Sequence, residues 1–273
     1  MKLLKSLSIL LLGSIVVACS TNPFTGKQTL ALVPNSQILP MAFQQYQEFL
    51  SENKVVKNTA DAQMVKSVGQ KIAAAAERYL TANGYAGYLT DYRWEYNLVD
   101  SKDVNAWCMP GGKIVVYTGI LPITKNEAGL AAVMGHEVAH ALANHGQQRM
   151  SAGQLQQLGA VAGNVALSNS PENQQIFNTA YGLGSTVGIM LPFSRSHETE
   201  ADHIGLILMA IAGYEPSVAA ELWQRMQAQE NGSAPPEFLS THPSSSTRIQ
   251  NIQAWAPEAR AEANKFGITS FKR

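Results

Sequence analysis

The sequence predicts a mainly helical α+β fold that contains a small antiparallel sheet. Apolar residues recur at helical spacing through most of the chain, whereas strand-like alternation is confined to one short segment and a β-branched run to another. With 273 residues, of which 45% are hydrophobic and 15% charged, the chain is long enough and apolar enough to bury a sizeable core.

The composition excludes two functional classes. Lysine plus arginine and aspartate plus glutamate number 20 each, so the chain has no basic excess and nucleic acid is not expected as a partner. The sequence has 2 cysteines, Cys19 and Cys108, and this excludes a secreted scaffold held together by several disulfides.

The N-terminus carries the pattern of an export signal. Lys2 and Lys5 form a positive segment, and the apolar run Leu7–Ala18 follows it. That run has about 12 residues, against the roughly 20 that a membrane span needs. It ends directly before Cys19, and the sequence Val-Val-Ala-Cys resembles the bacterial lipobox, in which the cysteine is acylated and becomes the new N-terminus. An ordinary secretory signal or an uncleaved anchor is the alternative interpretation.

These features predict the domain organisation. Residues 1–18 are a lipoprotein signal peptide, residues 19–34 are a lipidated N-terminus and tether, and residues 35–273 are a single domain. Ser20 follows the acylated cysteine, and by resemblance to enterobacterial sorting this favours the outer membrane. We therefore expect a protein held on the periplasmic side of the bacterial cell envelope by a lipid anchor in the membrane.

The first part of the domain combines two helices with two strands. Apolar stripes predict helices over Asn35–Ser51 and Asn58–Leu80. Tyr92–Val99 alternates as a half-buried strand does, and Lys113–Thr118 is the β-branched run. These strands form the predicted antiparallel sheet. For the second strand, edge pairing with an extended peptide and an ordinary place in the sheet are both open.

Helices dominate the chain after residue 125. Each is predicted from apolar residues three and four positions apart. The expected segments are Asn126–Gln147, one or two helices between Ala152 and Gly182, Ser196–Ala212, Pro216–Gln229 and a last helix near Thr247–Trp255.

The chemistry begins with the motif His136-Glu137-Val138-Ala139-His140, which lies among strong helix formers. Residues four apart share one face of a helix, so both imidazoles can reach one tetrahedral zinc ion. Glu137 lies next to the first ligand and can address a water molecule on the metal. The motif therefore predicts a zinc site with its own general base.

A catalytic zinc site needs a third protein ligand. The next dense group of ionisable residues begins the helix predicted at 196–212, where Glu198 and Asp202 share a face. One face can thus offer a ligand together with a supporting carboxylate. From spacing alone, His197 and His203 compete with Glu198 for the role of ligand.

Several segments together resemble one enzyme family, over nearly the whole mature chain. They include Gly135-His-Glu-Val-Ala-His, Glu198-Thr-Glu-Ala-Asp, Val104-Asn-Ala-Trp-Cys-Met-Pro-Gly-Gly-Lys-Ile and Ser240-Thr-His-Pro-Ser-Ser-Ser-Thr-Arg. In these segments the chain is similar to the gluzincin metallopeptidases that include the CAAX prenyl endopeptidase and the HtpX membrane protease. It is most similar to their periplasmic lipoprotein branch. The resemblance implies a zincin-like metallopeptidase domain with the sheet next to the His-Glu-x-x-His helix.

The resemblance also implies roles for individual residues. One Zn²⁺ per chain is held by His136, His140 and Glu198. Glu137 is the general base, and Asp202 supports the site or donates a proton.

Four further residues are implied near the bound substrate. Asn105 and Ala106 line the cleft, while His242 and Arg248 contribute near the scissile bond. His242 has two possible roles, because an imidazole there can donate a hydrogen bond to the oxyanion or occupy the open metal position at rest. We expect donation to dominate, so that replacing His242 lowers activity.

The sequence thus predicts a zinc-dependent endopeptidase that hydrolyses unfolded, damaged or misassembled envelope proteins. Protein or peptide substrates are expected, together with envelope assembly or quality-control proteins as partners. The alternative is a metal-binding assembly factor or holdase whose proteolysis is latched or vestigial. The presence of Glu137 favours the enzyme, because a protein without catalysis has no need of a general base.

Overall fold

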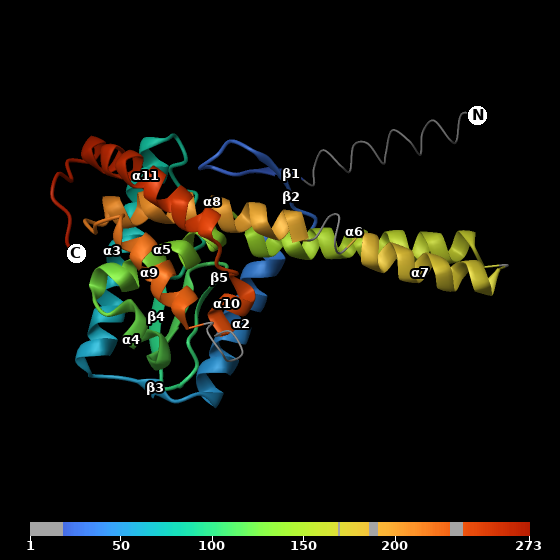
Figure 1. Ribbon diagram of the computed structural model, residues 1–273, viewed down its shortest axis with the longest axis horizontal. Helices are drawn as coiled ribbons and strands as arrows, with labels where there is room; N and C mark the ends of the chain where they lie inside the picture. Colours follow the sequence, from blue (N-terminus) through green and yellow to red (C-terminus); the bar gives the residue numbers. More distant parts are fainter. Residues whose placement is uncertain (1–18, 169, 186–190, 230–236) are drawn as a thin grey trace. The chain divides into compact units, whose positions relative to one another are not determined.

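The computed structural model describes residues 19–168, 170–185, 191–229 and 237–273 (Figure 1). The signal peptide predicted over residues 1–18 lies outside this part. The described residues form two compact units, and unit 1 comprises residues 19–38 and Asn144–His197. Unit 2 comprises Leu39–Ala143 and Glu198–Arg273.

The sheet of unit 2 has four strands in the order β3-β4-β6-β5. They are β3 (Val55–Val56), β4 (Glu95–Val99), β5 (Ala106–Met109) and β6 (Lys113–Tyr117). The predicted fold class is confirmed, but the sheet is mixed rather than antiparallel. The chain reverses once into β5 and again into β6, so that β6 runs parallel to β4 and antiparallel to β5.

This topology decides which strand is at the edge. β6 lies between β4 and β5, so the predicted strand at 113–118 is an interior strand and cannot pair with a peptide as an edge. Within the described residues, β5 pairs with β6 alone and forms one edge of the sheet, and β3 forms the other. The sequence pattern missed β5 because its four residues are too few to show a period.

Helix α5 (Glu127–Leu142) is the centre of unit 2, and every residue from Ala128 to Leu142 is buried. It packs against α3 (Ala60–Ala82), β5 and α9 (Val218–Ala228). Its first turn is capped by the Asn126 side chain, which accepts a hydrogen bond from the Gly129 amide. Because α5 is apolar on all sides, it is stable only when neighbouring elements bury every face of the helix.

The other helices of the fold complete unit 2. They are α2 (Asn35–Glu52, in unit 2 from Leu39 onward), a short 3-10 turn (Thr118–Ile120), α4 (Leu121–Thr124), α8 (Leu191–Ile211, in unit 2 from Glu198 onward), α10 (Glu237–Thr241) and α11 (Ser246–Lys265). The predicted helices are confirmed except for the one over 126–147, and α11 is longer than expected because it continues through Pro257.

The helix predicted over 126–147 is interrupted, because α5 ends at Leu142 and α6 begins at His145. Asn144 between them has a φ of 56°, a left-handed conformation that asparagine tolerates better than most residues. No change of period marks this point, since the apolar pattern runs on through the break.

Unit 1 contains the hairpin of β1 (Cys19–Thr21) and β2 (Gln28–Leu30) and the helices α6 (His145–Ala166) and α7 (Pro171–Ser185). The segment predicted as a tether thus contains a β-hairpin, and β2 contacts α6. Among the described residues, no helix is both long enough and apolar enough to span a membrane.

Candidate active site

Helices α5 and α8 meet at two glycines, and this contact positions the site. A Cβ atom at Gly135 would lie 2.9 Å from the Gly205 carbonyl oxygen, and one at Gly205 would lie 2.9 Å from the His136 amide nitrogen. Only residues without a side chain allow backbones to approach so closely. The contact places the His-Glu-x-x-His helix directly against the helix that carries Glu198 and Asp202.

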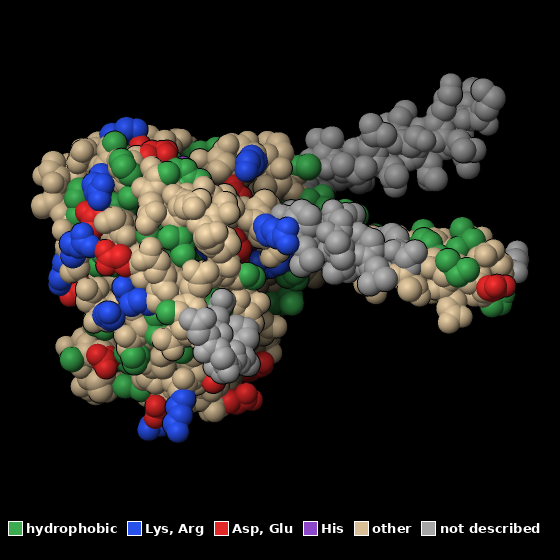
Figure 2. All heavy atoms as spheres, viewed as in Figure 1, with side chains coloured by type: hydrophobic (Ala, Val, Ile, Leu, Met, Phe, Trp, Pro, Cys, Tyr) green, Lys and Arg blue, Asp and Glu red, His purple; other side chains and the backbone are tan. Residues whose placement is uncertain are grey.

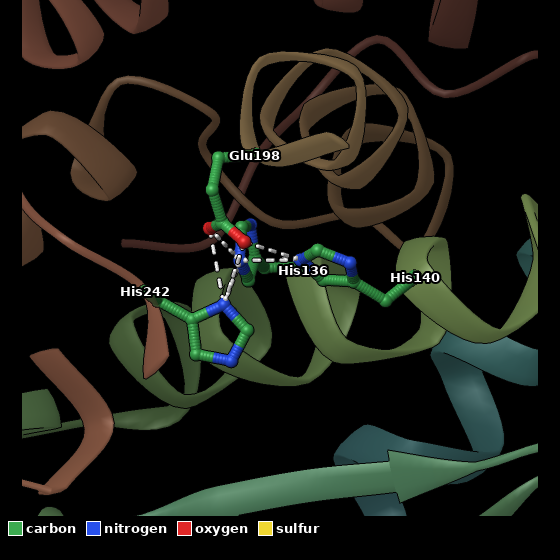
Figure 3. Close-up of side chains that lie close together, drawn as sticks. All are labelled: His136, His140, Glu198 and His242. Atoms are coloured by element: carbon green, nitrogen blue, oxygen red, sulfur yellow. Dashed lines mark hydrogen bonds and ion pairs between the residues drawn. The ribbon is translucent and has the colours of Figure 1, made fainter. Parts of the chain in front are cut away.

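Four buried side chains converge at this crossing: His136 and His140 from α5, Glu198 from α8 and His242, which follows α10 (Figure 3). Their donor atoms lie within 4.8 Å of one another. His136 Nε2 lies 3.1 Å from His140 Nε2 and 3.2 Å from Glu198 Oε2, and His140 Nε2 lies 3.3 Å from Glu198 Oε1.

These spacings fit a zinc ion. Donor atoms about 2.0–2.1 Å from a tetrahedral zinc lie about 3.3–3.4 Å from one another. The three distances among His136, His140 and Glu198 agree with that value, and a donor set of two imidazoles and one carboxylate is typical of zinc sites. The residues present therefore fit the metal.

His242 supplies a fourth donor. Its Nδ1 atom lies 3.3 Å from His136 Nε2 and 3.0 Å from Glu198 Oε2. Its Nε2 atom lies 3.4 Å from Glu137 Oε1. In this arrangement the imidazole occupies the fourth corner of the group and also contacts the predicted general base.

The carboxylates of the site are held in their charged form. Burial acts to raise the pKa of Glu198, but contacts with His136, His140 and His242 bring it well below its ordinary value. Burial likewise opposes ionisation of Asp202, whose pKa is nevertheless lowered by the Arg248 guanidinium and by His136. Ionised carboxylates are the form that a metal ligand and its supporting group require.

The two histidines of α5 differ in their electrostatic surroundings. Burial acts to lower the pKa of His136, but Asp202 and Glu198 raise it to about 9. Burial dominates for His140 and brings its pKa well below the ordinary value. His136 has the stronger carboxylate support because Asp202 Oδ1 lies 3.1 Å from its second ring nitrogen.

The structure places the remaining predicted residues as follows. Asn105 and Ala106 are buried at the beginning of β5, the edge strand that packs on α5. Arg248 is buried between Asp202 and Glu198 and contacts both carboxylates. Its guanidinium therefore belongs to the support of the metal group in this arrangement.

The competing ligand candidates lie elsewhere. His203 contacts Glu258 at 3.2 Å on the surface, and neither it nor His197 belongs to the four-residue group. Within unit 1, His197 instead stacks on His145 at 4.1 Å between ring centroids. Trp223 is buried in the core, and its ring covers the Arg248 guanidinium at 4.0 Å and lies 5.6 Å from the His136 ring.

The fold and site together define a zinc metallopeptidase domain of the gluzincin type, in which a glutamate from a second helix completes the set of two histidines. The chain belongs to peptidase family M48, whose profile matches residues 59–256. M48 metalloproteases use zinc, in agreement with the donor set.

Relatives come from mitochondria and from bacteria. The chain is 37% identical over 193 residues to the mitochondrial metalloendopeptidase OMA1 of Schizosaccharomyces pombe, covering 70% of this chain and 54% of the relative. It is 34% identical over 203 residues to OMA1 of Saccharomyces cerevisiae, covering 71% and 56%. The β-barrel assembly-enhancing protease of Escherichia coli is 26% identical over 203 residues, covering 72% and 39%. The chain thus spans about half the length of the yeast relatives.

Proposed function

We propose that this protein is a zinc-dependent endopeptidase of the bacterial envelope that hydrolyses unfolded, damaged or misassembled proteins. The convergence of His136, His140 and Glu198 at zinc-like spacing, with Glu137 beside them, carries the proposal. The family membership supports peptide bonds as the substrate class.

The chain's own groups account for the reaction. When bound by His136, His140 and Glu198, zinc supplies a Lewis acid that acidifies water and polarises the peptide carbonyl. Glu137 accepts the proton of the attacking water and delivers it to the leaving amine. His242, whose ring lies beside Glu137, is placed to donate to the oxyanion once substrate has displaced it from the metal group.

Edge strand β5 is the proposed substrate platform. It packs on α5, and Asn105 and Ala106 form its entry. An extended peptide that pairs with β5 is held by backbone hydrogen bonds, which place little demand on its sequence. Binding of this kind suits unfolded chains, whose backbone is exposed, better than folded ones.

The position of His242 favours a second state in which proteolysis is latched. With Nδ1 of His242 among the donors, the metal group is closed by four protein side chains rather than three. A catalytic zinc requires an open position for water or substrate. The resting enzyme is then inactive until the segment that carries His242 moves.

The envelope location is supported by the lipobox resemblance and by the exposure of Cys19, the predicted acylation site. The E. coli relative is named a β-barrel assembly-enhancing protease. This name is consistent with the proposed envelope substrates and with envelope assembly factors as partners. We therefore retain the periplasmic lipoprotein branch and the outer membrane as the proposed assignment.

Digestion of unfolded casein by the purified protein tests the activity, with and without a chelator and with zinc added back. Loss with chelator and recovery with zinc are expected. Labelled-palmitate incorporation in cells tests the anchor separately. We expect label in the wild type and none in Cys19→Ser, and label in the substituted protein would refute acylation at this residue.

A further inference from the structure

Helix α6 of unit 1 presents an apolar face that its own unit leaves open. Five large hydrophobic side chains on this helix are 42% to 68% exposed: Met150, Leu155, Leu158, Val161 and Val165, here called the α6 stripe. At 100° per residue these positions fall within an arc of about 140° on one side of the helix. Figure 2 shows hydrophobic side chains gathered on this helical hairpin.

The α6 stripe is not the surface that packs on α7. Gly163 faces Phe177 of α7 so closely that a Cβ atom would lie 2.1 Å from its ring. Asn164 exchanges hydrogen bonds with Asn178 of the same helix. At helical spacing Gly163 lies about 160° from both Val161 and Val165, whereas Asn164 lies at the border of the α6 stripe, about 60° from Val161. The hairpin is therefore closed on one side and apolar on the other.

The sequence around the α6 stripe is nearly free of charge. From Met150 to Ser194, Glu172 is the one charged residue, and Arg149 and Arg195 stand on either side of this segment. Burying such a surface in a lipid interface requires no desolvation of charged groups along its length. The exposed Arg149 next to Met150 is suited to lipid phosphates at the same depth.

The predicted acylation site is connected to the beginning of α6 by a short hydrogen-bonded segment. Cys19 pairs with Leu30 in the β-hairpin. Two residues further on, the Leu32 amide donates to Ser151 Oγ at 3.0 Å, and Gln147 Nε2 donates to the Val33 carbonyl at 2.5 Å. Cys19 therefore lies within about 15 Å of Ser151. A lipid on Cys19 holds the beginning of α6 at the bilayer.

We propose that the α6 stripe lies on the lipid bilayer as a second membrane contact beside the acylated N-terminus. This inference rests on the proposed lipidation of Cys19 for the position of the bilayer, whereas the apolar face is observed independently. Acyl chains already give stable attachment, so the second contact fixes how unit 1 lies on the membrane. A lipid surface is favoured over a second copy of the chain because the anchor holds this helix at the bilayer.

The test uses the mature chain, residues 19–273, as Cys19→Ser, so that both the acyl group and the predicted signal peptide are absent, and flotation with vesicles of phosphatidylethanolamine containing phosphatidylglycerol. We expect binding of this protein and a loss of roughly 10²-fold or more in the additional variant Leu158→Gln/Val161→Gln/Val165→Gln. Each buried side chain of this size contributes roughly tenfold. The single change Val165→Gln is expected to cost roughly tenfold, which guards against misfolding of the triple variant.

Met41→Gln is the matched control, because Met41 is 45% exposed on α2. Its binding is expected to equal that of the Cys19→Ser protein. The proposal is overturned if the Cys19→Ser protein does not float, or if the α6 variants float as well as it does. A dimer that the α6 variants convert to a monomer, without vesicle binding, identifies a second copy as the occupant and overturns it too.

Failure of the proposed function has a different readout. Casein digestion and the mass of the mature N-terminus are measured on the same preparations. Absence of proteolysis in the wild type counts against the proposed enzyme, and an unacylated Cys19 counts against the proposed anchor. The effect of the α6 changes on flotation still decides whether the α6 stripe binds the bilayer.

Discussion

Arg248 donates two hydrogen bonds of 2.7 Å to the carboxylate of Asp202, one from Nε and one from Nη2. The same carboxylate lies 3.1 Å from Nδ1 of His136. A carboxylate fixed in this way sets the ring orientation of a ligating histidine. Asp202 and Arg248 therefore act on zinc through His136, as positioning residues.

Asp202→Asn tests this chain of contacts. The neutral amide of the substituted side chain cannot replace the charged carboxylate that accepts both Arg248 hydrogen bonds and contacts the His136 ring. The ring orientation of His136 is then less well fixed, so zinc affinity is expected to fall roughly 10- to 100-fold. Competition with a zinc-binding dye measures it. Asp103→Asn, an exposed site, is the control. Equal affinities for wild type and Asp202→Asn would contradict a positioning role.

The proposed zinc ligands include Glu198 but not Glu200, which lies on the same helix. Glu198→Ala removes a donor that lies within 3.3 Å of both His136 and His140, so zinc content after dialysis is expected to fall strongly. Glu200 lies outside the four-residue group, and Glu200→Ala is expected to retain the metal. Metal analysis of both proteins decides the assignment. Equal losses, or a loss with Glu200→Ala alone, would overturn it.

Replacement of His242 reports on the latch. From the sequence alone, donation to the oxyanion is expected to dominate, whereas the place of Nδ1 among the donors favours the closed state. We now expect His242→Ala to digest casein faster, by roughly tenfold if the closed form is favoured by about 1.4 kcal/mol. A loss of roughly 10² to 10³ in kcat would show that donation matters more. Unchanged kcat and KM would remove both roles.

Glu215 links stability to pH. It accepts hydrogen bonds from Arg260 and from the Ser217 amide at the start of α9. Burial acts to raise the pKa of Glu215, but Arg260 and Ser217 lower it from 4.5 to about 2. Because the folded state binds this proton more weakly, the stabilisation is complete above pH 4.5 and is lost as the pH falls towards 2.

Glu215→Gln is therefore expected to lower the free energy of unfolding by about 1–2 kcal/mol at neutral pH. In urea titrations, the difference in unfolding free energy between Glu215→Gln and wild type should shrink as the pH approaches about 2, the pKa of the Glu215 carboxyl in the folded state. Glu221→Gln on the exposed side of α9 is the control, with a change within about 0.5 kcal/mol. A difference for Glu215→Gln that does not depend on pH would contradict the ionic origin.

Local periodicity predicted much of this molecule. Residues four apart must share a helix face, so the pairing of His136 with His140 followed from the sequence, as did most helices. The break at Asn144 did not follow, because one left-handed residue interrupts a helix without changing the apolar pattern around it. The parallel pairing of β4 with β6 depends on where β5 inserts, which is a tertiary property.

The site was predicted only in part, because the third zinc ligand also depends on tertiary packing. Glu198, His203 and His197 were comparable from spacing, and the crossing of α5 and α8 at Gly135 and Gly205 separates them by bringing Glu198 to the metal group. The place of Arg248 against Asp202 depends on α11 packing, to which no short-range pattern refers.

Glu137→Gln tests the central claim most directly. The amide keeps the size of the side chain and leaves His136, His140 and Glu198 intact, but it cannot accept a proton from water. We expect the purified variant to retain one zinc per chain and to digest unfolded casein roughly 10² to 10⁴ times more slowly than wild type. Digestion at the wild-type rate by a zinc-loaded Glu137→Gln protein would contradict the account.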